Sequence, residues 1–176
     1  MKRKGWLIIV FIVIIGGVVW LLRPNYIKEG VSLLEQGKYQ EAIATFEKQA
    51  EKGKELGETF LGQGIAYYEL GEYDTCIEKF EKALAEGVVS QKTTYRFIGN
   101  AHMKLEQYEA AIEAYDLGVY AEGESEEALQ EMQFNRIVAY ERLAKWKRAK
   151  ELMEEYLQQY PDDEEAQREA EFLRTR

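Results

Sequence analysis

Cysteine and histidine, two residue types that often carry chemistry, are nearly absent from this sequence of 176 residues. Each occurs once, as Cys76 and His102. A lone cysteine cannot form an internal disulfide, and the pair offers too few ligands for a zinc site. The sequence also has no glycine-rich phosphate loop and no nucleophile motif, and its many carboxylates are not spaced toward one pocket. We therefore expect no enzyme activity, no metal and no cofactor.

Basic residues are outnumbered by acidic residues beyond the N-terminal segment. The chain has 23 basic and 32 acidic residues, a formal net charge of −9. Four basic residues precede Pro24, where there is no acid, which leaves 19 basic against 32 acidic residues in the remainder. Such an acidic body repels phosphate backbones, so nucleic acid is not an expected partner.

One long uncharged segment is present, at residues 6–22. As a helix, 17 residues span about 25 Å, close to the shortest length that crosses a bilayer. Trp6 and Trp20 suit the two interfaces, and Lys4 and Arg23 flank the segment. A cleavable signal peptide is the alternative, but no Ala-x-Ala site follows, since the first alanine is Ala42. The pattern predicts a single transmembrane anchor and a membrane-bound protein.

The charges beside this anchor predict its orientation. Lys2, Arg3 and Lys4 precede it, whereas only Arg23 and Lys28 follow closely. Because positive flanks stay in the cytoplasm, residues 1–5 are expected there, with the remainder of the chain in an extracytoplasmic location.

The rest of the sequence repeats itself at intervals of 34, 35 and 38 residues. Glycine stands at the same position of the first three repeats, as Gly30, Gly64 and Gly99. In the fourth repeat this position holds Ile137. Aromatic, small and large residues recur after them in the sets Tyr39, Ala42, Phe46; Tyr73, Cys76, Phe80; Tyr108, Ala111, Tyr115; and Trp146, Ala149, Met153. A period in this range indicates stacked pairs of helices. Glycine within a helix costs about 1 kcal/mol relative to alanine, so three in phase indicate close helix crossings.

This pattern resembles the tetratricopeptide repeat (TPR) family over residues 24–163. The resemblance implies an all-α solenoid of about four helical hairpins, with repeats near 24–56, 57–90, 92–124 and 125–163 inside a domain covering 24–176. Ser125 suits the N-cap of the fourth repeat. A largely polar helix at 163–174 would cap the end of the array.

In this family the first helices of the hairpins line a concave groove that binds peptides. The resemblance therefore implies a protein or peptide ligand and a binding groove formed by Ile27, Val31, Leu34, Leu61, Ile65, Tyr68, Arg96, Asn100, Met103, Phe134, Asn135 and Val138, with Lys104 and Arg142 also facing inward. The predicted groove changes from apolar to polar along the array.

Three of these residues look like the carboxylate clamp of some family members. Arg96, Asn100 and Asn135 would grip the terminal carboxylate of a peptide, since guanidinium and amide groups can both donate to it. However, Glu165 and Glu169 stand where the clamp has further basic residues, which disfavours an anion.

Four functions remain open from the sequence. The first is a membrane-tethered, extracytoplasmic protein-interaction adaptor, and the second is a similar scaffold facing the cytoplasm. The third is a structural protein that self-associates, for example as a homodimer through its groove or its ends. An enzyme is the fourth, and the sequence gives it the least support.

Overall fold

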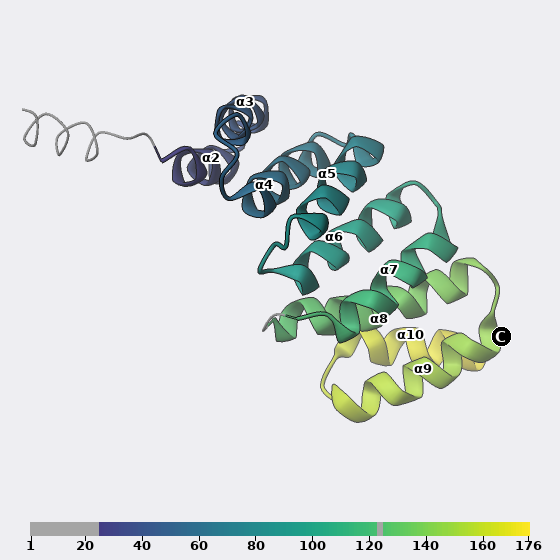
Figure 1. The fold of residues 1–176 in the computed structure, drawn as a ribbon. Coiled ribbons are helices and arrows are strands. Elements are labelled where there is room, and N and C mark those ends of the chain that lie inside the picture. Colours follow the sequence, from purple (N-terminus) through teal and green to yellow (C-terminus); the bar gives the residue numbers. More distant parts are fainter. Residues whose placement is uncertain (1–24, 123–124) are drawn as a thin grey trace, which may run out of the picture.

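A computed structural model describes residues 25–122 and 125–176 of the chain, and these residues are all-helical (Figure 1). The helices are α2 (Tyr26–Glu35), α3 (Tyr39–Ala50), α4 (Leu56–Glu69), α5 (Tyr73–Ala85), α6 (Gln91–Lys104), α7 (Tyr108–Tyr120), α8 (Glu126–Arg142), α9 (Trp146–Gln159) and α10 (Glu164–Arg174). Within this part of the chain, no helix is long and apolar enough to cross a membrane. The anchor predicted at residues 6–22 lies outside the described residues.

The helices form four antiparallel hairpins followed by a single helix, as the repeat pattern predicts. The hairpins are α2–α3, α4–α5, α6–α7 and α8–α9. Each first helix also contacts the first helix of the next hairpin, in the pairs α2–α4, α4–α6 and α6–α8, whereas second helices of the described part have at most marginal contact with one another. First helices therefore lie closer together and line the inner face of the array.

The repeated glycines allow an aromatic ring from the second helix to lie against the first. The rings of Phe46, Phe80 and Tyr115 are fully buried. A Cβ atom on Gly30 would lie 2.5 Å from Cζ of Phe46, and one on Gly64 or Gly99 would overlap Phe80 or Tyr115. The predicted close crossing is thus confirmed, and its partner is the ring itself.

The fourth hairpin makes the same crossing with different side chains. Ile137 replaces the glycine, and Met153 stands where the others have a ring. Both are almost completely buried in one cluster with Ala149 and Tyr156. The flexible side chain of Met153 on α9 therefore leaves room for Ile137 on α8, so this crossing does not need a glycine.

The turn inside each hairpin has the same hydrogen bonds. In each hairpin, the residue two positions before the start of the second helix has a positive φ. These residues are Gly37, Gly71, Glu106 and Ala144. The following amide donates to a carbonyl five residues back, as from Lys145 to Tyr140 at 2.9 Å. This is the Schellman ending of a helix, in which glycine is favoured because its backbone tolerates positive φ.

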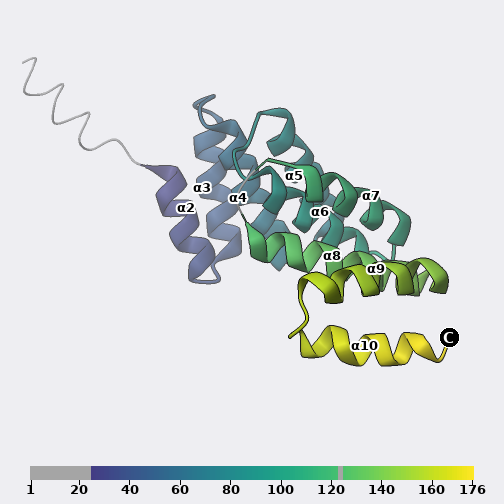
Figure 2. The same cartoon turned by 90° about the horizontal axis from the view of Figure 1, so that it is seen from below.

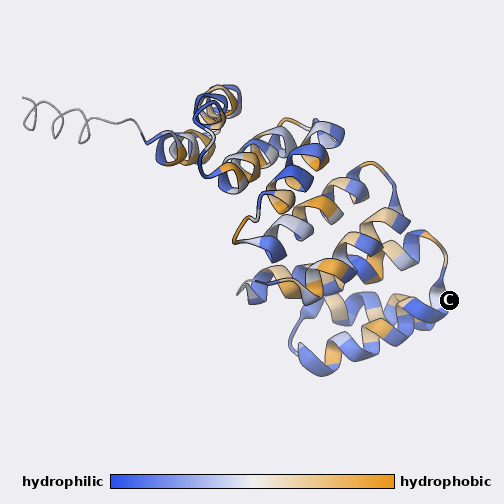
Figure 3. Cartoon of the chain, in the orientation of Figure 1, coloured by the Kyte–Doolittle hydropathy of each residue, from blue (hydrophilic) through white to orange (hydrophobic). Residues whose placement is uncertain are grey.

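The last helix covers the end of the array, beside α9 (Figure 2). Asp163 caps it, since its Oδ1 accepts from the amides of Glu165 and Ala166 at 3.0 Å. Ala166 and Leu173 are buried against α9. Hydrophilic residues cover much of α9 and α10 (Figure 3), as expected of a helix that separates the core from water.

Candidate functional site: the inner face

The inner face has an open hollow of about 470 Å³ beside the C-terminal parts of α4, α6 and α8. Three first helices contribute to it, α4 through Tyr68, α6 through Asn100, Met103 and Lys104, and α8 through Asn135 and Arg142. Glu106 of the α6–α7 turn and Tyr108 at the start of α7 complete it. The hollow thus combines aromatic rings, amides and two cations.

Lys104 and Arg142 are the cations of this hollow, and both are exposed. No ion pair found in the described residues includes either of them. Glu106 is the single carboxylate in the lining. The hollow is therefore locally cationic, although the chain as a whole is acidic.

The structure brings four of the predicted groove residues to this hollow: Tyr68, Asn100, Met103 and Asn135. The apolar residues of α4, Leu61 and Ile65, instead pack at the edge of the core cluster that contains Phe80. Phe134 packs against the α9–α10 cluster, with its ring centroid 5.7 Å from that of Tyr156.

The remaining predicted residues occupy other places. Ile27 and Leu34 are half-buried on α2, and Val31 on the same helix is 44% exposed. Val138 is half-buried on α8. Arg96 lies on α6, with its guanidinium carbon 4.5 Å from the ring centroid of Phe97.

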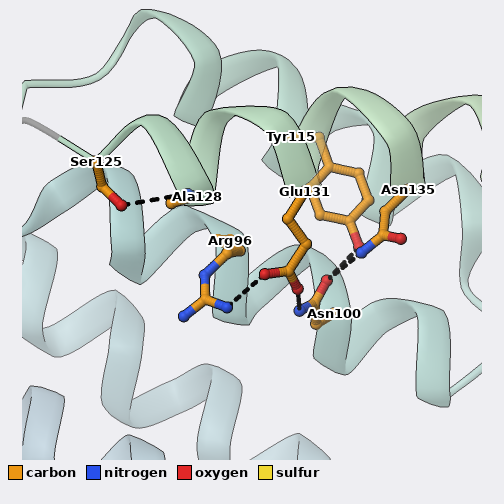
Figure 4. A network of polar contacts seen from close by, with 7 residues as sticks. All are labelled: Arg96, Asn100, Tyr115, Ser125, Ala128, Glu131 and Asn135. Atoms are coloured by element: carbon orange, nitrogen blue, oxygen red, sulfur yellow. Dashed lines mark hydrogen bonds and ion pairs between the residues drawn. The ribbon is translucent and has the colours of Figure 1, made fainter. Parts of the chain in front are cut away.

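Arg96, Asn100 and Asn135 are neighbours, and a fourth residue connects the first two (Figure 4). Glu131 of α8 accepts from Nη1 of Arg96 on Oε2 and from Nδ2 of Asn100 on Oε1, both at 2.6 Å. Oδ1 of Asn100 accepts from Nδ2 of Asn135 at 3.0 Å and from the hydroxyl of Tyr115 at 2.6 Å. One carboxylate of the chain itself therefore lies among the three residues predicted to bind one.

Burial fixes one end of this network. Tyr115 is fully buried, and this burial raises the pKa of its hydroxyl well above the ordinary value. The hydroxyl therefore stays protonated and donates to Asn100. Asn100 is thereby oriented with its Oδ1 toward Tyr115 and Asn135 and its Nδ2 toward Glu131.

Glu131 is a residue of this site that the repeat pattern does not single out. Relative to the repeats, α8 starts one turn early, after the N-cap Ser125, whose Oγ accepts from the amide of Ala128 at 3.2 Å. The predicted N-cap is confirmed. The sequence does contain a usable signal, because Glu131 precedes Asn135 by four residues and so shares its helix face.

The two residues that the composition makes conspicuous are structural. Cys76 is fully buried in the core, and this desolvation raises the pKa of its thiol to about 12. His102 is half-buried, and its Nδ1 lies 2.7 Å from Oε1 of Gln107 across the α6–α7 turn. Among the described residues, no cluster of potential metal ligands occurs.

A stack of helical hairpins with an open, polar inner face defines a class of helical-repeat scaffold. Family models described as tetratricopeptide repeat match residues 27–87, 61–127 and 131–163. The chain belongs to the tetratricopeptide repeat family. A comparison with curated proteins found no match.

Solved structures with this fold include MamA and YrrB. A MamA double mutant (RS-1 ArsTM) matches with a TM-score of 0.73 and 20% identity, over 86% of this chain and 85% of MamA. YrrB, described as a TPR protein with an unusual peptide-binding site, matches with a TM-score of 0.71 and 22% identity, over 84% of this chain and 74% of YrrB. At such identities the likeness is one of fold.

Proposed function

We propose that this chain is a membrane-tethered adaptor that binds a protein or peptide segment in its inner groove, outside the cytoplasm. The observation that carries the proposal is the open hollow of about 470 Å³, to which three consecutive first helices contribute. Peptide grooves combine surfaces for apolar side chains with a few polar groups that fix orientation. In this hollow, the surfaces for apolar side chains come from Tyr68, Met103 and Tyr108. The polar groups come from Asn135, Lys104 and Arg142.

The charge of the hollow favours a segment with acidic character. Lys104 and Arg142 are available cations, and their attraction would add to the on-rate and to the choice of partner. YrrB shares the fold and has a peptide-binding site by its description, which supports a peptide as the kind of ligand.

Photo-crosslinking in the native cell tests the groove directly. A photoreactive amino acid replaces Lys104, which lines the hollow, and in the control it replaces Glu113, which is exposed on the second helix α7. We expect an adduct with another protein from position 104 and none from position 113. Absence of any adduct at 104 would contradict a groove ligand, and an adduct with a second copy alone would favour the self-associating alternative.

The membrane tether and the orientation are supported by the uncharged run at residues 6–22 and its flanking charges. Alkaline phosphatase fused after Arg176 is active only outside the cytoplasm, so activity of the fusion is expected. An inactive phosphatase with an active cytoplasmic reporter at the same position would support a scaffold facing the cytoplasm. Release of the chain from membranes by alkaline carbonate would contradict the anchor.

A further inference from the structure

The network on the inner face already contains a bound carboxylate, and it belongs to the chain. Both oxygens of Glu131 are held, one by the guanidinium of Arg96 and the other by the amide of Asn100, at 2.6 Å each. Hydrogen bonds of this length from a cation to a carboxylate are among the stronger ones in proteins. The position formed by Arg96 and Asn100 is therefore competent to bind a carboxylate.

This position is accessible from the groove. The side chains of Arg96 and Glu131 are 22% and 33% exposed. Asn100 lines the open hollow as well as holding Glu131, and Asn135 joins it there. A segment lying in the hollow would thus have the Glu131 carboxylate beside it, at the edge of its own binding surface.

The receiving groups are held in place without Glu131. Asn100 is oriented by the buried hydroxyl of Tyr115 and by Asn135. Arg96 packs on the ring of Phe97, and its Nε is buried without a hydrogen-bond partner in the described structure. Removal of Glu131 would therefore leave a preformed site with an additional unused donor.

We infer that Glu131 is a built-in competitor, which occupies the carboxylate position of the groove and excludes a partner's carboxylate until it leaves. The inference rests on the proposed groove function and adds the chemical class of the group recognised and its regulation. Because Glu131 is attached to the site, its effective concentration there is in the range of mM or above, so a free carboxylate competes poorly. A rearrangement of the first turns of α8 that withdraws Glu131 would open the position.

The asparagines of this chain allow a direct test by NMR. The sequence has three of them, Asn25, Asn100 and Asn135, so selective ¹⁵N-asparagine labelling of the full chain in detergent micelles gives three side-chain amide groups. Asn25 is an internal control, because it is exposed at the N-cap of α2. The probes are three acetylated alanine pentapeptides. One has a free C-terminus, one is amidated with a central glutamate, and one is amidated without a carboxylate.

For the wild type, we expect no probe to shift the Asn100 signals at millimolar concentration. For Glu131→Ala, the carboxylate probes should shift them saturably, with half-saturation at least tenfold below the highest concentration at which the wild type shows no shift. The Asn25 signals should not change, and the uncharged probe should shift none of the three. The comparison of the two carboxylate probes tells whether the position prefers a chain terminus or an acidic side chain. Glu131→Gln, which keeps the shape but not the charge, should give a smaller gain.

Two further variants locate the effect. Glu127→Ala removes the same charge one turn earlier from an exposed position of α8 and should behave as the wild type. Arg96→Ala with Glu131→Ala removes both members of the ion pair and should lose the gained response. No shift in either Glu131 variant, or an equal response in the wild type or the double variant, would overturn the inference. A crosslink from position 104 together with such a result would leave the proposed function intact.

Discussion

At the scale of single residues, small side chains decide how the helices cross and turn. Phe46 shows this best, since a Cβ on Gly30 of its own hairpin or on Gly62 of the next would overlap its ring. The ring thus lies between two glycines, within a repeat and between repeats. Two predictions concern such positions.

Gly64→Ala should destabilise the protein. The new methyl group would overlap the buried ring of Phe80, and overpacking of this kind costs about 2 kcal/mol. Urea unfolding followed by circular dichroism measures the loss. Combination with Phe80→Leu should give less than the sum of the two single losses, because the smaller side chain makes room. Additive losses would show that the ring and Gly64 do not meet.

Ala144→Gly should stabilise the protein. Ala144 has a φ of 53°, at the position where two other hairpins have glycine. Relief of the left-handed conformation outweighs the greater freedom of glycine in the unfolded chain, so the free energy of unfolding should rise by about 0.5–1 kcal/mol. Gly71→Ala, at the equivalent turn, should lower it by a similar amount in the same urea experiment. A loss of stability in Ala144→Gly would contradict this account of the turns.

The glycine phases show what single-residue reasoning can predict. Gly30, Gly64 and Gly99 have a recognisable spacing, so the crossings could be predicted from the amino-acid sequence. Glu131 could not be found in this way, because the equivalent residues of the second and third repeats are Glu58 and Thr93, so no residue type is shared by all three repeats at its position. Repeat alignment detects residue types that recur, whereas the ion pair of Glu131 with Arg96 depends on an arginine that does not recur. Leu61 and Phe134 stand at the positions equivalent to Arg96.

At the scale of elements, two glutamates lie close together where the capping helix α10 meets α8. Glu141 of α8 lies near Glu169 of α10, and Oε1 of Glu141 is buried. Burial, with a contribution from Glu169, raises the pKa of Glu141 to about 8, and Arg142 opposes this shift. The sequence predicts that α10 forms and is largely polar. It does not predict that Glu169 lies near Glu141, because that depends on how α10 packs.

This pair predicts a pH dependence of stability. Glu141 binds its proton more tightly in the folded chain than in the unfolded chain, whose glutamates titrate near pH 4.5. Stability from this group is therefore greatest at or below that pH and is lost progressively as the pH rises to about 8. Thermal unfolding from pH 5 to pH 8 should show a decline that is smaller in Glu141→Gln. Equal slopes in the two proteins would contradict the assignment, and Glu113→Gln, at an exposed site, is the control.

At the scale of the whole molecule, the inner face of an acidic protein contains a hollow that is locally cationic. The fold and the order of hairpins follow from the repeat period, which is why they could be predicted closely. Of the predicted groove residues, Leu61 and Phe134 are half-buried against core clusters and are not among the residues that line the hollow. Residue periodicity gives the side of a helix but not the depth to which a side chain is covered.

The most direct test of the account measures binding of the partner captured from position 104 to the full chain by titration calorimetry. Lys104→Glu with Arg142→Glu reverses the charge of the hollow, and Glu113→Lys changes the outer face. We predict at least a tenfold loss of affinity, about 1.4 kcal/mol, for the double variant and less than a twofold change for Glu113→Lys. Unchanged binding by the double variant, or an equal loss with Glu113→Lys, would contradict a function located in the inner groove.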